Sequence, residues 1–148
     1  MTVMDKFSLQ GKTALVTGGA GLLGKQFTRA LGEAGASVVV ADLDFTVAQA
    51  QAEALQENNL QALAVAVDVT QPESVASMVD QVVDKFGGLD VLVNSAAMDP
   101  KFDPENLQGQ SGNAFEDYPL DSWKQALDVN LTGMFLACQA AARQMITQ

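Results

Sequence analysis

Histidine is absent from the sequence, and cysteine occurs once, at Cys138. A chain with one cysteine cannot form an internal disulfide, and without histidine or a cysteine cluster it has no ligand set for zinc, so we expect no metal site. Apolar residues at helical spacing surround Cys138, which predicts a buried thiol rather than a reactive nucleophile. Basic residues are also scarce, because 8 Lys and Arg stand against 18 Asp and Glu, for a net charge of −10. This balance argues against nucleic acid as a partner, since binding it depends on neutralising phosphates with Lys and Arg.

Long apolar runs are missing as well. No segment approaches the roughly 18 to 20 apolar residues that cross a bilayer, and residues 1–7 lack the charged stretch and apolar stretch of a secretion signal. We therefore expect a soluble, cytoplasmic protein that does not contact membranes. With 148 residues, 48% of them hydrophobic, the chain is of single-domain size and can bury a core.

Strand-like apolar runs alternate along the chain with stretches of helical periodicity. The runs are Lys12–Thr17, Ser37–Ala41, Gln61–Val67 and Asp90–Asn94. This alternation predicts an α/β fold with a parallel sheet and helices on both faces, and the near-continuous Val, Leu and Ala of the runs fit strands covered on both sides. The segment from Thr70 to Glu73 has the spacing of a capping box. The helix that it opens carries apolar residues at Val75, Met78, Val79, Val82, Val83 and Phe86.

Periodicity disappears from Met98 to Pro119, where Pro, Asp, Asn, Gly and Gln are common. A loop of about 20 residues is long for a compact α/β domain, and it follows the fourth strand at the edge where such sheets bind ligands, so we expect it to be functional or mobile. A last helix then runs to about Ile146, with Asp121 or Ser122 as candidate caps. Its apolar face comprises Leu120, Trp123, Leu127, Leu131, Met134, Phe135 and Cys138.

Residues 13–42 combine a strand, a glycine-rich turn, a helix and a second strand that ends in a carboxylate. The turn reads Thr17-Gly-Gly-Ala-Gly21-Leu-Leu-Gly24, and Asp42 follows it at about the 20-residue distance of a dinucleotide-binding βαβ unit. In such a unit, the glycines let backbone amides approach a pyrophosphate at the positive end of the helix. We expect one face of the helix to carry Leu22, Leu23, Phe27, Leu31 and Ala34.

Asp42 indicates which dinucleotide is bound. A carboxylate at this position accepts hydrogen bonds from the ribose hydroxyls and repels a 2′-phosphate, which favours NAD over NADP. Leu43, the next residue, brings no positive charge that could hold that phosphate. The competing interpretation is that Asp42 is an ordinary strand terminator.

Several segments, in their order and spacing, resemble the short-chain dehydrogenase/reductase family from Lys12 to the last helix. They are Thr17 to Gly24, Asp42, Asp68-Val69-Thr70, Asn94-Ser95-Ala96-Ala97 and Asn130. The resemblance implies a Rossmann-type doubly wound parallel sheet, of which this chain would build the first four strands in the order 3-2-1-4 with helices on both faces. Residues 1–148 would then form a single NAD-binding domain that lacks the catalytic half.

The same resemblance assigns roles to individual residues. It places the segment Asp68-Val69-Thr70 where the family hydrogen-bonds adenine, and Asn130 in a proton relay, where it holds a water. From the residues alone, Asp68 could instead cap a turn, and Asn130 could be an ordinary polar position in a helix. The other expected cofactor contacts are Thr17, Gly18, Gly19, Gly21, Leu22, Leu23, Gly24, Leu43, Asn94, Ser95 and Ala96.

Two positions depart from the pattern of the smaller, soluble branch of this family. Leu22 stands where that branch has glycine, so that the glycine spacing is similar to the sugar-nucleotide branch, and Ala97 also replaces a glycine. The downstream motifs resemble the smaller branch, so we interpret Leu22 as a local change in the turn. The glycine turn together with the segment 99–103 is also similar to members that modify flagellin or surface polysaccharide.

Catalysis in the family depends on a Ser, a Tyr and a Lys, the last two in a Tyr-x-x-x-Lys helix beyond the one that contains Asn130. The one tyrosine of this chain, Tyr118, precedes that helix and is followed four residues later by Ser122. The resemblance therefore implies an NAD(H)-dependent oxidoreductase that transfers hydride between nicotinamide and a small alcohol or carbonyl, represented here by its cofactor-binding half. We expect this polypeptide alone to be inactive.

Two other functions stay open at this stage. The chain could be an NAD-binding or regulatory module without turnover, or a structural partner whose last helix docks a second chain, since that helix builds dimer interfaces in the family. A fourth strand without a neighbour would expose the apolar edge Val91–Val93, which is a template for pairing. We therefore expect either a fragment of a longer protein or an oligomer.

Overall fold

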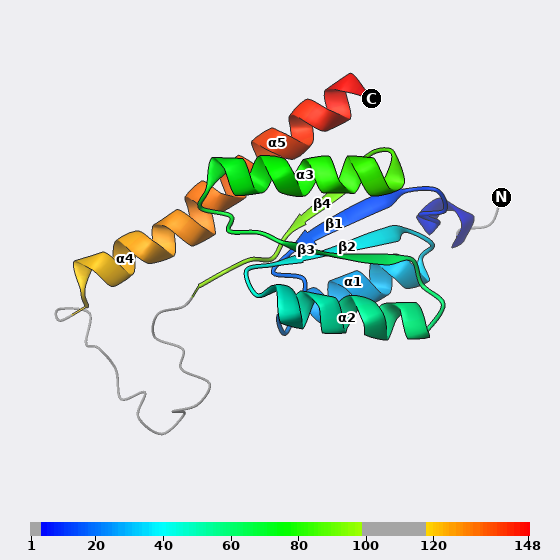
Figure 1. Cartoon of the computed structure of the whole chain (residues 1–148), viewed down its shortest axis with the longest axis horizontal. Helices are drawn as coiled ribbons and strands as arrows, with labels where there is room; N and C mark the ends of the chain where they lie inside the picture. The colour runs from blue at the N-terminus through cyan, green and yellow to red at the C-terminus, as the bar shows by residue number, and fades with distance from the viewer. Residues whose placement is uncertain (1–3, 99–117) are drawn as a thin grey trace.

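A computed structural model describes residues 4–98 and 118–148 of the chain (Figure 1). The strands are β1 (Thr13–Thr17), β2 (Ser37–Asp42), β3 (Ala62–Ala66) and β4 (Val91–Asn94). The helices are α1 (Gly24–Glu33), α2 (Phe45–Glu57), α3 (Pro72–Phe86), α4 (Leu120–Leu127) and α5 (Met134–Thr147), with a 3-10 turn η1 (Met4–Phe7) and a π-helical segment η3 (Asp128–Gly133). Most of the long loop expected from Met98 to Pro119, including the segment 99–103, lies outside the described residues.

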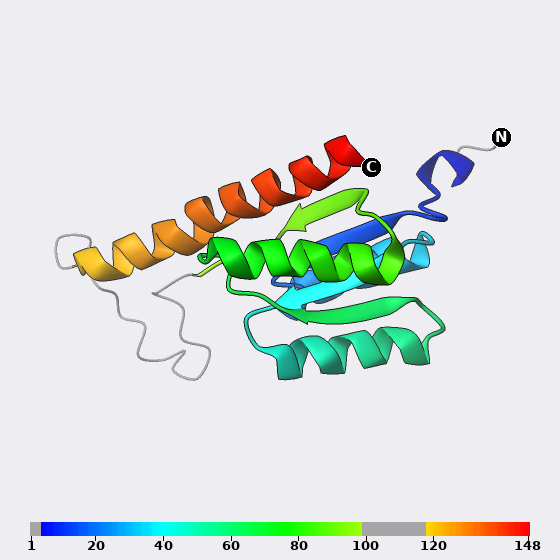
Figure 2. The same ribbon diagram turned by 45° about the horizontal axis from the view of Figure 1, so that its top comes forward.

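The sheet is parallel throughout, with the strand order β3-β2-β1-β4. Helices α1 and α2 cover one face of it, and α3 and α5 lie over the other (Figures 1 and 2). The predicted doubly wound α/β fold and its strand order are therefore confirmed. Because β1 lies between β2 and β4, the order reverses between β1 and β4, and in open α/β sheets ligands bind at the carboxyl ends of the strands at such a reversal.

Side chains of successive strand residues point to opposite faces, so that the sheet separates two apolar layers. One layer packs the strand residues Leu15, Val39 and Val65 against Met78 of α3 and Ala137 of α5. The other packs strand residues Ala14, Val38 and Val40 against Ala48 and Ala52 of α2. All five residues of β1 are buried, as the continuous apolar run predicts for a strand covered on both faces.

Helix α3 follows its predicted pattern along its length but not at its start. Val75, Met78, Val79 and Val82 are buried against the sheet, and each such side chain contributes about 1.5–3 kcal/mol when it leaves water. The helix ends at Gly87, whose φ of +81° lies in the left-handed region. The prediction of a capping box from Thr70 to Glu73 is wrong, because the N-cap residue is Gln71 and its side chain makes no hydrogen bond to the helix.

Of the large apolar residues on its expected face, helix α1 packs only Leu31 against the core, and partly. Leu22 just before the helix is 89% exposed, and Leu23 and Phe27 are exposed as well. The buried positions are Gly24, Thr28 and Gly32. Small residues are needed there because α1 approaches its neighbours closely: a Cβ at Gly32 would lie 3.0 Å from Leu60 Cδ1.

The last helical stretch, α4 through α5, shows the same inversion. Its large apolar residues Leu120, Trp123, Leu131, Met134 and Phe135 are exposed, whereas Gly133, Ala137 and Ala141 are buried. Cys138 is exposed, so the prediction of a buried thiol is wrong. The predicted caps are wrong too, because the N-cap of α4 is Pro119, with no side-chain hydrogen bond.

Strand β4 pairs with β1 alone, and in the described parts of the chain no strand adjoins its other edge. All of its residues are partly buried, in contrast to the fully buried β1. An unpaired strand edge presents backbone donors and acceptors to any extended segment. The edge at Val91–Val93 is therefore unpaired among the described residues, as expected, and its pairing with another strand stays a prediction.

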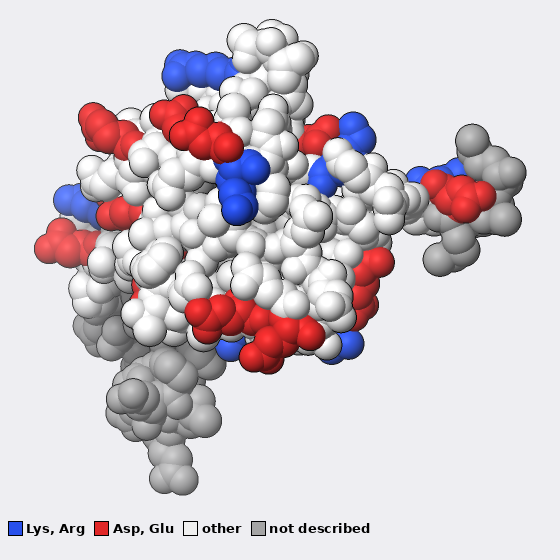
Figure 3. Space-filling view, turned by 45° about the vertical axis from the view of Figure 1, so that its right-hand side comes forward, with Lys and Arg blue, Asp and Glu red and all other residues white. Residues whose placement is uncertain are grey.

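Charged side chains are spread over the surface, with carboxylates on several elements and single basic groups between them (Figure 3). An ion pair between distant parts of the chain joins Lys12 Nζ to Asp90 Oδ1 at 2.8 Å, between the starts of β1 and β4. The hydrogen bond from Lys12, together with one from the Thr13 amide, holds the pKa of Asp90 below its ordinary value. On α1, Glu33 raises the pKa of Arg29 through a hydrogen bond and charge attraction.

Candidate functional site

A pocket of about 360 Å³ opens at the carboxyl ends of the strands, on both sides of the reversal between β1 and β4. Its volume is in the range that small-molecule sites occupy. Most of the residues around it are predicted cofactor contacts, whereas Val67, Ala97, Met98 and Val129 are not. The lining comprises Gly18, Gly21, Asp42, Leu43, Val67, Asp68, Val69, Ser95, Ala96, Ala97, Met98 and Val129.

The glycine turn after β1 is shaped by two glycines that no other residue could replace without strain. Gly18 has a φ of +62°, and a Cβ on it would lie 2.7 Å from Ala96 Cα. A Cβ on Gly24 would collide with the carbonyl oxygen of Gly18. These close approaches let the turn fold back between β1 and the start of α1, so that its backbone lines the pocket.

Backbone amides of this turn divide into paired and unpaired ones. Gly19 N donates to Ala41 O, and Gly21 N donates to Gly18 O. Leu22 N and Leu23 N find no acceptor in the described residues, and they lie directly before α1, where the helix dipole is positive. Amides in this position suit an anion such as a diphosphate. The Leu22 side chain points into solvent and does not line the pocket, so it leaves this place accessible.

Asp42 ends β2 on the opposite side of the turn. Its Oδ2 accepts a hydrogen bond from Ala20 N at 3.2 Å, and its Oδ1 accepts a long one of 3.4 Å from Asp44 N. These contacts fix the carboxylate at the rim of the pocket while each oxygen keeps a second lone pair for hydroxyl donors. Leu43 lies beside it on the pocket wall.

An apolar part of the pocket is formed by Leu43, Val67, Val69 and Val129, with Asp68 among them. Asp68 begins the loop between β3 and α3, where its Oδ1 accepts hydrogen bonds from Thr70 N at 2.9 Å and Thr70 Oγ1 at 2.7 Å. Apolar walls with one carboxylate suit a flat heteroaromatic ring that carries an amino group.

The loop after β3 is held by further contacts that the sequence interpretation did not include. Asp68 N donates to Ser74 Oγ at 3.0 Å. Gly133 of η3 meets Val69 so closely that a Cβ there would lie 2.6 Å from Val69 Cγ2. This approach brings Val129 to the pocket wall. The sequence could have suggested this role of Ser74, because a hydroxyl in the first turn of a helix commonly hydrogen-bonds a nearby backbone group.

Thr17 connects the ends of β1 and β4. Its Oγ1 accepts hydrogen bonds from Ser95 N and Ala96 N, both at 3.3 Å. Asn94 points elsewhere, because its Nδ2 donates to Cys138 Sγ on α5 at 3.2 Å. Its Oδ1 is buried without a partner among the described residues. The structure thus brings Ser95 and Ala96 to the pocket and leaves Asn94 against α5.

Asn130 lies in the π-helical segment η3, and its side chain hydrogen-bonds the chain segment that follows β4. Its Oδ1 accepts from Met98 N at 2.7 Å, and its Nδ2 donates to Met98 O at 2.9 Å. These two bonds use one of the two Nδ2 hydrogens and one of the two Oδ1 lone pairs, so the side-chain amide keeps one donor and one acceptor position.

Comparison with known proteins identifies the family. A sequence model described as short chain dehydrogenase matches residues 12–148. The chain belongs to the short-chain dehydrogenase/reductase family. It is 39% identical over its full length to Short chain dehydrogenase/reductase dpchG of Colletotrichum higginsianum, of which it covers 52%.

Two solved structures are similar over nearly the whole chain. A short-chain type dehydrogenase/reductase from Mycobacterium marinum has a TM-score of 0.88 and 38% identity, over 100% of this chain and 56% of that protein. NAD+-bound xylitol dehydrogenase has a TM-score of 0.82 and 34% identity, over 95% of this chain and 50% of that protein. The chain thus spans about half the length of the relatives that it matches.

The short-chain dehydrogenase family uses a nicotinamide dinucleotide, and the site fits such a cofactor on its own geometry. The turn between Gly18 and Gly24 has no room for added side chains, and it ends in the two unpaired amides. A carboxylate, Asp42, lies at the rim of the pocket, and apolar side chains line the wall beside it.

Over residues 4–98 and 118–148, no helix combines the length and apolar character that crossing a bilayer demands. The same residues contain no group of three or more His, Cys, Asp or Glu side chains that could hold a metal ion.

Proposed function

We propose that this chain is the cofactor-binding half of a short-chain oxidoreductase that uses NAD in preference to NADP. The observation that carries the preference is the Asp42 carboxylate, which Ala20 N and Asp44 N fix at the rim of the pocket. The ribose of NAD carries hydroxyls at its 2′ and 3′ positions, which can donate hydrogen bonds to this carboxylate. The 2′-phosphate of NADP would be repelled by it. The NAD-bound state of the similar xylitol dehydrogenase supports the proposal.

The test is a calorimetric titration of the chain with NAD and with NADP. Because a like charge placed opposite another costs several kcal/mol, we expect NAD to bind at least about tenfold more tightly. Asp42→Asn should bring the two affinities together. Asp44→Asn is the matched control, since Asp44 caps α2 through Thr46 N, asparagine caps equally well, and Asp44 does not line the pocket. Equal or tighter binding of NADP by the unaltered chain would defeat the proposal.

We further propose that the whole oxidoreductase moves hydride between nicotinamide and a small alcohol or carbonyl. The family supports this reaction class. This chain covers 56% of the Mycobacterium marinum dehydrogenase/reductase and 50% of the xylitol dehydrogenase. We therefore expect the 148-residue chain to bind NAD without turnover. Formation of NADH from NAD in the presence of simple alcohols, followed by absorbance, would contradict that expectation.

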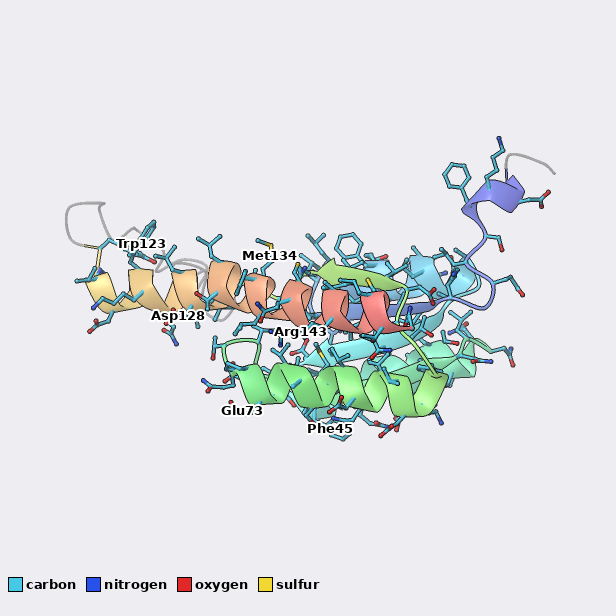
Figure 4. All side chains as sticks on the ribbon, turned by 90° about the horizontal axis from the view of Figure 1, so that it is seen from above. Phe45, Glu73, Trp123, Asp128, Met134 and Arg143 are labelled. Atoms are coloured by element: carbon cyan, nitrogen blue, oxygen red, sulfur yellow. The ribbon has the colours of Figure 1, made fainter. Side chains whose placement is uncertain are left out.

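We also propose that a second copy of the chain covers the exposed apolar face of α4 and α5. Figure 4 shows Trp123 and Met134 on the side of this helical stretch turned away from α3. Exposed large side chains at Leu131 and Phe135 continue that face, and contiguous exposed apolar patches mark association sites. In sedimentation experiments, Phe135→Glu should shift the protein towards monomer, whereas Glu73→Gln on α3 should not.

A further inference from the structure

The π-helical segment η3 presents one side to the pocket and the other side to solvent. On the inner side, Val129 lines the pocket, and Gly133 packs closely against Val69, which also lines it. On the outer side, Leu131 is exposed and belongs to the apolar face of α4 and α5. We propose that η3 couples these two sides, so that NAD binding and self-association of the chain strengthen each other. This inference rests on the proposed binding of NAD and on the proposed second copy, and it adds the linkage between them.

The inner contacts of η3 join it to two separate walls of the pocket. Gly133 meets the wall after β3, where an added Cβ would lie 2.6 Å from Val69 Cγ2. Asn130 meets the wall after β4, where its Oδ1 accepts from Met98 N at 2.7 Å and its Nδ2 donates to Met98 O at 2.9 Å. Both Val69 and Met98 line the pocket. A ligand that lies between the two walls therefore restrains both of them, and η3 with them.

The conformation of η3 makes it the part of this helical stretch that responds to such restraint. The π-helical form is rare, and it occurs mostly as a single turn within an α-helix, frequently at a functional site. Here it lies between α4 and α5, and Gly133 is its one fully buried residue. A segment with few buried contacts has low local stability. Its order therefore depends on what binds at the pocket and on what packs on its outer side.

A second copy fits the outer side because the apolar face is long enough to pair with itself, and narrow enough for the pairing to be weak. Figures 1 and 2 show α4, η3 and α5 as one continuous rod whose α4 end extends beyond the sheet. At 1.5 Å per residue and a helix width of about 10 Å, two rods that pair along Leu120–Thr147 would bury about 800 Å² in total. Stable interfaces bury roughly 1,200–2,000 Å². The pairing is therefore marginal without ligand, and a modest coupling changes the amount of dimer.

The experiment measures the linkage in both directions on the full 148-residue chain. Sedimentation equilibrium gives the dimer dissociation constant without NAD and with saturating NAD. Coupling between sites is reciprocal and typically amounts to about 5–150-fold. Since a dimer has two pockets, a fivefold effect at each should lower the dimer dissociation constant about 25-fold. Calorimetric titrations above and below that constant should correspondingly give NAD affinities that differ about fivefold.

Two matched residues of the outer face separate coupling from association. Trp123 on α4 is 53% exposed and Leu131 on η3 is 56% exposed, and neither lines the pocket. Trp123→Ser and Leu131→Ser should both weaken the dimer. NAD should still tighten the Trp123→Ser dimer about 25-fold, because its η3 packs against the second copy, whereas the shift in Leu131→Ser should fall to about fivefold or less. Equal shifts in the two variants would refute the role of η3.

The Phe135→Glu variant tests the inner half of the coupling without association. As a monomer, it should show slower hydrogen exchange at the η3 amides when NAD is added, with little change at the α4 amides. Unchanged exchange in η3 at saturating NAD would overturn the inference. Should Leu131→Ser not fold, as judged by circular dichroism, Leu131→Ala makes the same comparison with Trp123→Ser.

The outcomes distinguish this inference from the proposals on which it rests. If calorimetry of the unaltered chain shows no NAD binding, the proposed function fails and the linkage fails with it. If NAD binds but the chain stays monomeric at every concentration, NAD binding stands and the second copy and the linkage are both refuted. If the chain dimerises with the same constant in the presence and absence of NAD, both proposals stand and the linkage alone is refuted.

Discussion

Replacing Gly18 by alanine tests whether the turn after β1 requires glycine. Two separate physical effects act at this position. The φ of +62° is a conformation that alanine adopts poorly, and the added Cβ would lie 2.7 Å from Ala96 Cα and 2.8 Å from Ser95 O. Both contacts are with backbone atoms of the segment after β4. A rotamer change cannot relieve them, so β1 and the end of β4 would have to separate.

The two effects can be given magnitudes. The left-handed conformation costs an L-residue roughly 1–2 kcal/mol. Overpacking against atoms that cannot rotate away costs about 1–3 kcal/mol more. The reduced freedom of the unfolded chain returns about 0.4–1 kcal/mol. We therefore expect Gly18→Ala to lower the free energy of unfolding by about 3 kcal/mol, a large part of the roughly 5–15 kcal/mol that holds an ordinary domain.

Two other glycines separate these effects. Gly87, at the end of α3, has a φ of +81° and nothing within 4 Å of an added Cβ, so Gly87→Ala carries only the backbone strain. We expect it to destabilise by about 1 kcal/mol and to leave NAD affinity unchanged. Gly24 is not in the left-handed region, but its added Cβ would collide with Gly18 O, so Gly24→Ala carries only the steric effect. It should weaken NAD binding as Gly18→Ala does.

Urea unfolding followed by far-UV circular dichroism measures all three variants against the unaltered chain. The single tryptophan is a poor reporter, because Trp123 lies exposed on α4, far from the sheet core. NAD affinity is measured on the same preparations. The reasoning is refuted if Gly18→Ala is no less stable than Gly87→Ala, or if it binds NAD as tightly as the unaltered chain.

Three further substitutions test contacts that hold the site and the sheet. Because Lys12 keeps the folded-state pKa of Asp90 below its ordinary 3.8, the ion pair stabilises the fold above that pH and loses its effect as pH falls through the lowered value. Asp90→Asn should therefore cost about 1 kcal/mol at neutral pH and progressively less in acid, and a penalty independent of pH would contradict this. Thr17→Val removes the hydroxyl acceptor of the Ala96 amide, while the Ser95 amide keeps its bond of 3.1 Å to Thr17 O; it should cost about 1–3 kcal/mol in urea unfolding, with Thr17→Ser retaining most of the stability. Asn130→Ala removes the hydrogen bonds to both backbone groups of Met98, so hydrogen exchange at the Met98 amide should accelerate. Asn130→Asp keeps the acceptor for that amide and should preserve its protection. Equal exchange rates in the two variants would be evidence against this role of Asn130.

The elements that the sequence predicted well are those whose signals are local. The parallel sheet follows from the alternation of apolar runs, its strand order from the family resemblance, and the location of the pocket from a glycine turn that has a steric reason at Gly18. Asp42 is the last residue of β2 and Asp68 follows β3 by two residues, so both lie on the pocket at the same edge of a parallel sheet. Met98 and Val129 were missed although they adjoin Ala97 and Asn130, because the motifs mark particular positions and not their neighbours. The two hydrogen bonds with the Asn130 side chain hold Met98 at the pocket, and the packing of η3 brings Val129 there.

Helical periodicity finds that a helix has two faces but does not say which face is buried. In α5 the larger apolar side chains form the more prominent stripe, yet the face toward the sheet is Ala137 and Ala141. At η3 the reason is geometric, since Gly133 meets Val69 at a distance that excludes even a methyl group. A helix that must bring Val129 and Asn130 to the edge of the sheet has to approach it closely, and close approach selects small residues. Most of the side chains that periodicity marked as one apolar face, such as Trp123, Leu131 and Phe135, are therefore left on the outside, where they form an exposed apolar patch.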